Sequence, residues 1–155
     1  MKLHRDLREF IELLNSRGVE YLVVGGHAVA FHGHPRFTAD IDFWVRPENG
    51  NGRRLVEVLR GFGFEQLGLA ANDFVEPERI VQLGQPPHRI DLLTSVSGVD
   101  FDTAWQTREA GVLDGLPVSF LALESLIENK LASGRANDLA DVAQLKAIAA
   151  ARRKV

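Results

Sequence analysis

Apolar residues recur along this chain at the spacings of helices and strands, and they predict the order of its first elements. Over residues 3–14 they recur mostly at every third or fourth position, and Gly18 follows, which predicts an amphipathic helix that ends at a glycine. The continuous apolar run over 21–24 predicts a strand that is buried on both faces. Residues 26–33 predict a short helix, because the ring of Pro35 prevents much continuation.

The next segment alternates between polar and apolar positions. Residues 40–45 have the sequence Asp-Ile-Asp-Phe-Trp-Val. Successive side chains of a strand point to opposite faces, so Asp40, Asp42 and Trp44 are expected to share one face and the apolar residues between them the other. Both carboxylates are therefore expected to point the same way.

The later elements are predicted from shorter patterns and from glycine and proline positions. In chain order they are a loop over 47–52, a helix that ends at 61–63, a return to the sheet over 64–68, strands over 79–84 and 88–93, and helices over 121–133 and 137–151. The 155 residues, of which 45% are hydrophobic, are enough for one core. We therefore expect a single α/β (α+β) domain over residues 1–155, with a small mixed β-sheet flanked by helices and a C-terminal helical segment over 119–155.

Composition and charge exclude several classes of protein. The chain has no cysteine, which excludes disulfides and zinc-thiolate sites. Its 18 basic and 21 acidic residues give a net charge of -3, so strong non-specific nucleic-acid binding is not expected. The N-terminal segment is charged and amphipathic, and no apolar run reaches the roughly 18 residues of a membrane span, so a cytoplasmic protein with no membrane partner is expected.

Two short motifs carry candidate chemistry. Gly25 and Gly26 stand between a predicted strand and a predicted helix, where backbone N–H groups can point at phosphate oxygens, although such a pair also fits a simple tight turn. Asp40 and Asp42 are expected to repel each other, and Mg²⁺ or Mn²⁺ would relieve that repulsion. Asp91 is a candidate third ligand, with a turn cap or an ion pair as the alternatives.

The order of these pieces resembles the nucleotidyltransferase superfamily that is related to DNA polymerase beta. In that pattern a glycine-containing helix start binds a triphosphate, a strand with two aspartates binds magnesium, and a third acidic residue completes the catalytic set. More narrowly, the chain is similar to small stand-alone bacterial nucleotidyltransferases, including toxin-like members of abortive-infection and toxin–antitoxin systems. The residues that carry this likeness are Gly25-Gly26-His27-Ala28, His32-Gly33, Arg36, Thr38, Asp40-Ile41-Asp42 and the segment 130–141.

One position departs from the superfamily pattern. Many members have a serine after the first glycine, and its hydroxyl contacts phosphate, whereas this chain has Gly26 and then His27. Backbone binding of phosphate does not need that hydroxyl.

The resemblance implies a nucleotidyltransferase-like fold and a metal-dependent transfer of a nucleoside monophosphate from an NTP to an acceptor hydroxyl. The acceptor classes that it implies are a protein side chain, an RNA end or a small molecule, and the toxin–antitoxin relatives imply a cognate antitoxin or another partner protein. The implied catalytic and metal-binding residues are Asp40, Asp42 and Asp91, and the implied nucleotide-binding residues are Gly25, Gly26, Arg36, Thr38 and Lys130.

The alternative function is a catalytically inactive subunit of the same fold that binds a nucleotide or a partner. Three retained carboxylates favour the enzyme, since a binding subunit has less need to bear their repulsion.

Individual side chains also have simpler interpretations. Arg36 and Thr38 fit surface or capping positions, and Lys130 and Arg135 fit a solvated helix face. Trp44 fits packing better than stacking on a base. The histidines at 27, 32 and 34 are expected to have structural roles, because no partners with metal-ligand spacing accompany them.

Overall fold

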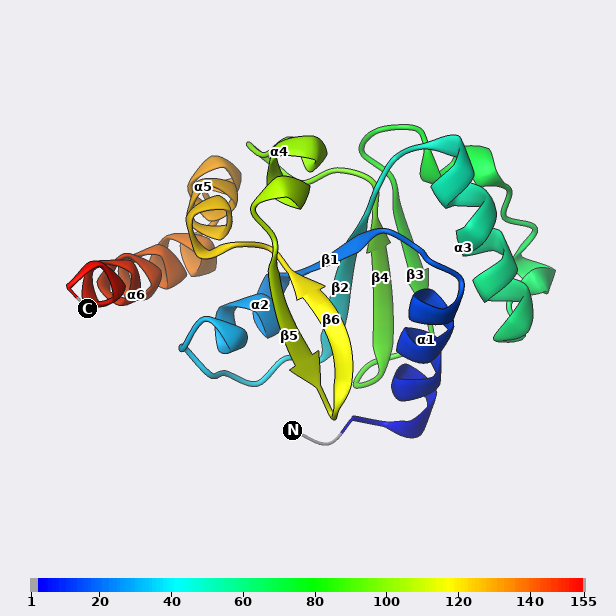
Figure 1. Ribbon diagram of the computed structural model, residues 1–155, viewed down its shortest axis with the longest axis horizontal. Helices are drawn as coiled ribbons and strands as arrows, with labels where there is room; N and C mark the ends of the chain where they lie inside the picture. Colours follow the sequence, from blue (N-terminus) through cyan, green and yellow to red (C-terminus); the bar gives the residue numbers. More distant parts are fainter. Residues whose placement is uncertain (1–2, 155) are drawn as a thin grey trace.

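A six-stranded mixed sheet lies at the centre of the protein, for which the computed structural model describes residues 3–154 (Figure 1). Its strands are β1 (Tyr21–Val24), β2 (Asp40–Val45), β3 (Ile80–Leu83), β4 (Arg89–Leu93), β5 (Glu109–Leu113) and β6 (Leu116–Phe120). The spatial order is β3-β4-β2-β1-β6-β5. The β2/β4 and β1/β6 pairs are parallel and the other pairs are antiparallel, which confirms the predicted fold class.

Helices surround this sheet (Figure 1). They are α1 (Arg5–Ser16), α2 (Gly25–Phe31), α3 (Asn49–Gly61), α4 (Phe101–Gln106), α5 (Leu123–Ser133) and α6 (Ala136–Arg153). The paired helices α5 and α6 extend to one end of the long axis, and α3 lies toward the other. Within residues 3–154 no helix combines the length and the apolar character that crossing a membrane requires.

The two faces of β2 have different surroundings, as its alternating sequence predicted. Phe43 packs against Phe10 of α1, with ring centroids 5.9 Å apart, and belongs to the apolar core. On the other face Trp44 meets Phe101 of α4 edge to face, with centroids 5.0 Å apart, and only 2% of Trp44 is exposed. Trp44 therefore packs in the core and is not available to stack on a base.

The prediction of a loop over 47–52 was wrong, because α3 already begins at Asn49. The Glu48 side chain accepts a hydrogen bond from the backbone N–H of Asn51 and caps the helix start. The buried side chain of Asn51 accepts from the N–H of Glu20 and donates to the carbonyls of Glu20 and Arg46. These tertiary hydrogen bonds support a helical start that the Asn- and Gly-rich sequence did not indicate.

The predicted return to the sheet over 64–68 was also wrong. Residues Glu65–Leu67 form a short 3₁₀ helix, η1, and the N–H of Leu67 bonds locally to the carbonyl of Phe64 at 3.1 Å. Gly63 and Gly68 flank it with φ of 91° and 67°. Positive φ at both glycines turns the chain before and after this segment, so no extended run forms there. A second 3₁₀ helix, η2 (Ala71–Phe74), packs on α3.

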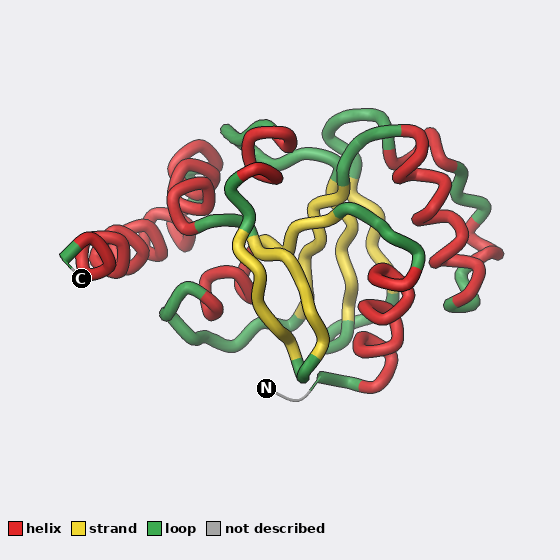
Figure 2. Tube along the Cα trace, in the orientation of Figure 1, coloured by secondary structure: helices red, strands yellow, loops and turns green. Residues whose placement is uncertain are grey.

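No element was predicted between the strand over 88–93 and the last two helices, where the structure has α4, β5 and β6 (Figure 2). The β5–β6 hairpin turns at Asp114 and Gly115, whose φ values are 49° and 78°. An Asp-Gly pair between two extended runs is a strong signal for such a two-residue hairpin turn, so this element was predictable from the sequence.

Gly52 supplies a test of the packing between α3 and η2. A Cβ at position 52 would lie 2.6 Å from the backbone oxygen of Ala71, whereas a Cβ at Gly61, in the last turn of the same helix, would make ordinary contact with the Leu13 side chain at 3.7 Å. We expect Gly52→Ala to lower the free energy of unfolding by ~2 kcal/mol through overpacking. Gly61→Ala is the matched control, and better helix propensity should make it neutral or stabilising by ~0.5 kcal/mol. Urea unfolding of both variants measures this, and equal effects would contradict the packing account.

Candidate functional site

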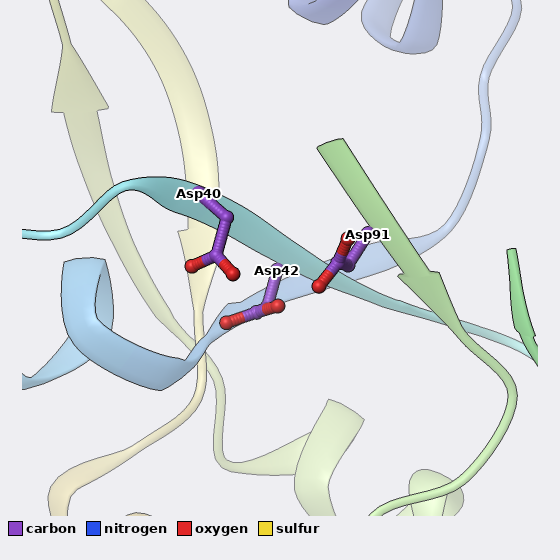
Figure 3. Close-up of side chains that lie close together, drawn as sticks. All are labelled: Asp40, Asp42 and Asp91. Atoms are coloured by element: carbon purple, nitrogen blue, oxygen red, sulfur yellow. The ribbon is translucent and has the colours of Figure 1, made fainter. Parts of the chain in front are cut away.

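Strand register brings three carboxylates together on one face of the sheet. In the parallel β2/β4 pair, Asp42 stands opposite Asp91, and Asp40 is two residues from Asp42 on the same face. One carboxylate oxygen from each of the three residues lies within 4.8 Å of the others. Figure 3 shows Asp42 between Asp40 and Asp91. The predicted triad therefore exists as a spatial cluster.

This cluster changes the protonation of its central member. Burial and, after it, the charges of Asp40 and Asp91 together raise the pKa of Asp42 to about 7, while Arg89 opposes the shift. The carboxylate is therefore costly to ionise beside its neighbours in the absence of a divalent cation. Among the described residues, this is the one cluster of at least three acidic or histidine side chains close enough to hold a metal ion.

The two predicted glycines lie directly beside the carboxylates. Gly25 follows β1, whose last residue Val24 is paired with Asp42, and it has a φ of 66°. A Cβ on Gly25 would collide with the Asp42 carboxylate, and a Cβ on Gly26 would lie 3.1 Å from Thr38. Glycine at both positions thus lets the Asp42 carboxylate and Thr38 pack directly against the backbone.

Thr38 holds the start of the aspartate strand. Its hydroxyl donates to the backbone oxygen of Asp40 at 2.8 Å and lies 3.4 Å from the Asp40 carboxylate. Thr38 therefore fixes the position of Asp40. Thr38 also lines the cleft that contains the carboxylates.

An ion-pair network holds the two predicted cationic residues of the site, Arg36 and Lys130. The Arg36 guanidinium donates to both carboxylate oxygens of Asp141, at 2.8 and 2.6 Å. Lys130 lies 3.0 Å from Asp141 and 3.0 Å from Asp138. Lys130 is 5% exposed, so it does not lie on the solvated helix face that was its alternative interpretation.

Asp138 completes this network at the start of α6. Burial raises the pKa of its carboxyl, but hydrogen bonds from Ser133, Arg135 and Lys130 outweigh burial and lower the pKa to about 2. Asp138 is therefore a stable anion at neutral pH, and it fixes Lys130 in a charged pair.

A cleft of about 1070 Å³ joins these parts. All predicted site residues line it: Gly25, Gly26, Arg36, Thr38, Asp40, Asp42, Asp91 and Lys130. It is also lined by residues that were not predicted as site residues, including Arg79, Arg89, Ser97, Asn129, Arg135 and Asp138. Of these, Arg89 could have been predicted from the sequence, because it is two residues before Asp91 on one strand and so shares its face.

The histidines do not join the carboxylate cluster. The Nε2 atom of His32 lies 2.7 Å from the carbonyl oxygen of Leu121, and its Nδ1 atom lies 3.4 Å from Glu109 and 3.2 Å from Arg152. Burial lowers the pKa of His32, so the ring is neutral at pH 7. His32 therefore links α2 to the strand that leads into α5 and to α6, which is a structural role.

Comparison with known proteins supplies a family. The family model described as nucleotidyltransferase of unknown function (DUF6036) matches residues 2–151. No curated protein is similar enough in sequence to serve as a relative.

Solved structures share the fold at low sequence identity. The candidate nucleotidyltransferase TM1012 from Thermotoga maritima is 16% identical, with a TM-score of 0.60 over 90% of this chain and 89% of that one. An antigenic nucleotidyltransferase-like protein from Paracoccidioides brasiliensis is 16% identical, with a TM-score of 0.52 over 90% of this chain and 74% of its own. The antibiotic-resistance factor ANT(2'')-Ia is 14% identical, with a TM-score of 0.50 over 96% and 90%. These likenesses confirm a nucleotidyltransferase-like fold.

The raised pKa of Asp42 predicts a pH-dependent stability. The folded protein holds a proton on Asp42 up to about pH 7, whereas the unfolded chain releases it near the ordinary value of 3.8, so stability falls as pH rises between these values. Asp42→Asn removes this ionisation and should therefore be more stable than the wild type at pH 8, by roughly 2 kcal/mol, with a smaller difference at pH 5. Urea unfolding in EDTA at both pH values measures the effect. A variant less stable than the wild type at pH 8 would contradict it.

The ion-pair network predicts that Lys130 is needed for stability. Replacing it by methionine leaves Asp138 and Asp141 close together and buried with fewer cations. We expect Lys130→Met to lower the free energy of unfolding by ~2–4 kcal/mol. Lys146→Met, on an exposed part of α6, is the matched control and should change it by less than ~0.5 kcal/mol. Similar thermal unfolding of the two variants would argue against the network.

Proposed function

The chain belongs to the family of nucleotidyltransferases described as of unknown function (DUF6036), and on that premise we propose that it is a divalent-metal-dependent enzyme acting on an NTP. It transfers a nucleoside monophosphate to an acceptor hydroxyl. The observation that carries the proposal is the convergence of three carboxylates, from two neighbouring parallel strands, beside a glycine-lined backbone in one cleft.

The donor set fits a hard divalent cation. The cluster consists of carboxylate oxygens alone, and burial, together with the charges of Asp40 and Asp91, raises the pKa of Asp42. Magnesium prefers a small number of carboxylates and completes its coordination with water and substrate phosphates, and manganese accepts the same ligands. Asp40 and Asp42 would hold the ion, with Asp91 as a third ligand or as the base. When bound, the ion would stabilise negative charge on the transferring and leaving oxygens.

The remaining cleft residues suit the triphosphate. Gly25 and Gly26 line the cleft, and a backbone without side chains lets a phosphate approach closely, while Thr38 holds Asp40 in place. Arg36 and Lys130 supply positive charge in the same cleft. Both cations are already oriented by Asp141, so they need little reorganisation when a polyanion enters.

The reaction is a displacement at the α-phosphorus. The acceptor oxygen forms a bond to that phosphorus, the bond from it to the bridging oxygen of the β-phosphate breaks, and pyrophosphate leaves. The acceptor proton passes to Asp91 where that carboxylate acts as the base. Positioning in the cleft and electrostatic stabilisation supply most of the acceleration.

The acceptor classes are a protein side chain, an RNA end or a small molecule. The cleft extends beyond the three carboxylates and is also lined by Ser97 and Asn129, which leaves room for a second substrate. The net charge of -3 favours a locally bound acceptor over a long nucleic acid held by a general basic field. The toxin–antitoxin role, the cognate partner and the cytoplasmic location stay predictions from the sequence.

A labelled-transfer assay tests the proposal. Purified protein is incubated with Mg²⁺ and each α-³²P-labelled NTP, with protein, RNA and small-molecule fractions of a lysate as acceptors. We expect label to enter one acceptor class with one or more NTPs. Asp42→Asn should lower the rate by at least about 100-fold, because it weakens the metal site.

Asp6→Asn is the matched control, because Asp6 lies exposed in the first turn of α1, and it should keep wild-type activity. Wild-type activity in Asp42→Asn would exclude the assigned site. Nucleotide binding by calorimetry without any transfer would instead support the non-catalytic binding subunit.

A further inference from the structure

Arg89 occupies an unusual place among the three carboxylates. Its Nη2 atom lies 2.5 Å from Asp40 Oδ2 and 3.2 Å from Asp91 Oδ2, and its Nε atom lies 2.9 Å from Asp91 Oδ1. One guanidinium therefore bridges two of the three acidic residues of the cluster. It donates no hydrogen bond to Asp42.

Strand register places Arg89 where it can bridge the two carboxylates. Arg89 is the first residue of β4 and stands opposite Asp40 in the parallel register, and it shares a strand face with Asp91 two residues later. The fork of the guanidinium can thus reach one carboxylate across the strands and one along its own strand. Any side chain at position 89 would point toward the carboxylate cluster. Arginine at this position gives the cluster a permanent positive charge.

Arg89 and a divalent cation compete for the same electron pairs. Oxygens of Asp40 and Asp91 that accept hydrogen bonds from the guanidinium have fewer lone pairs free for a metal, and the two positive charges repel each other. Arg89 also lines the cleft, so a guanidinium that leaves the carboxylates can meet substrate phosphates there.

We propose that Arg89 is the resident counter-cation of the Asp40–Asp91 pair, which holds the carboxylates together before the metal arrives and must yield to it. Arg89 is thus a positioning residue that weakens metal binding by the free enzyme. This inference rests on the proposed function, because it needs the aspartate cluster to bind a metal.

Calorimetric titration with Mn²⁺ alone tests it on the metal-free protein, in the absence of nucleotide. We expect Arg89→Met to bind Mn²⁺ about tenfold more tightly than the wild type, because the competing cation is gone. Arg89→Lys keeps the charge without the fork and should lie between the two. Without metal, Arg89→Met should unfold at a lower temperature than the wild type, and Mn²⁺ should raise its unfolding temperature more.

Arg79→Met is the matched control. Arg79 lines the same cleft, but its partners are Asp73 and Glu76, outside the cluster, so its loss tests the general effect of removing one positive charge. Its Mn²⁺ affinity should stay within about twofold of the wild type, since exposed charges at longer range are screened.

The outcomes distinguish failure of the Arg89 counter-cation from failure of the proposed metal site. Tighter Mn²⁺ binding in Arg89→Met, with Arg89→Lys between it and the wild type and Arg79→Met unchanged, supports the counter-cation. Equal or weaker binding in Arg89→Met and Arg89→Lys, with a wild type that binds, overturns it and leaves the proposed function intact. An equal gain in Arg79→Met also overturns it, because a general field effect then explains the result. Absence of Mn²⁺ binding in the wild type and in both Arg89 variants overturns the metal site and the inference together.

Discussion

Repulsion between three carboxylates that the strands hold together is the constraint on which the site depends. Asp42 and Asp91 face each other because β2 and β4 run parallel in that register, and Asp40 is added by the two-residue period of β2. No side-chain rotation is needed to assemble the cluster, so its negative charge is a property of the sheet itself. Burial raises the pKa of Asp42 first, and its neighbours add to that effect. A sheet that keeps such an arrangement is prepared for a cation.

Ion pairs hold a buried lysine in the same cleft. Lys130 is buried between Asp138 and Asp141, and Asp141 also accepts both hydrogen bonds from Arg36. The loop before β2 is thereby connected to α5 and α6, which are far from it in sequence. This network fixes the orientation of positive side chains that line the same cleft as the aspartates. Carboxylates and oriented cations in one cleft suit a metal-bound polyphosphate.

The residues of the site differ in how well the sequence predicts their positions. Alternation along β2 was enough to predict that Asp40 and Asp42 share a face, because a strand has a strict period of two. Asp91 was a candidate ligand from its place in a predicted apolar strand, but only the family resemblance joined it to the pair, since no local pattern reveals which strand will pair with β2. The burial of Lys130 was not predictable, because its partners belong to another helix and a lysine between Asn129 and Leu131 also fits a solvated helix face. The hairpin at Asp114 was missed although its turn signal was present.

The central claim is that a divalent cation and a triphosphate meet at the aspartate cluster. Anomalous diffraction from crystals grown with Mn²⁺ and each of the four α,β-methylene NTPs tests it most directly, because manganese can be located without reference to the surrounding density. The account predicts a manganese peak coordinated by Asp40 and Asp42, with the triphosphate against the backbone of Gly25 and Gly26. A triphosphate bound elsewhere, with no manganese at these carboxylates, would contradict it.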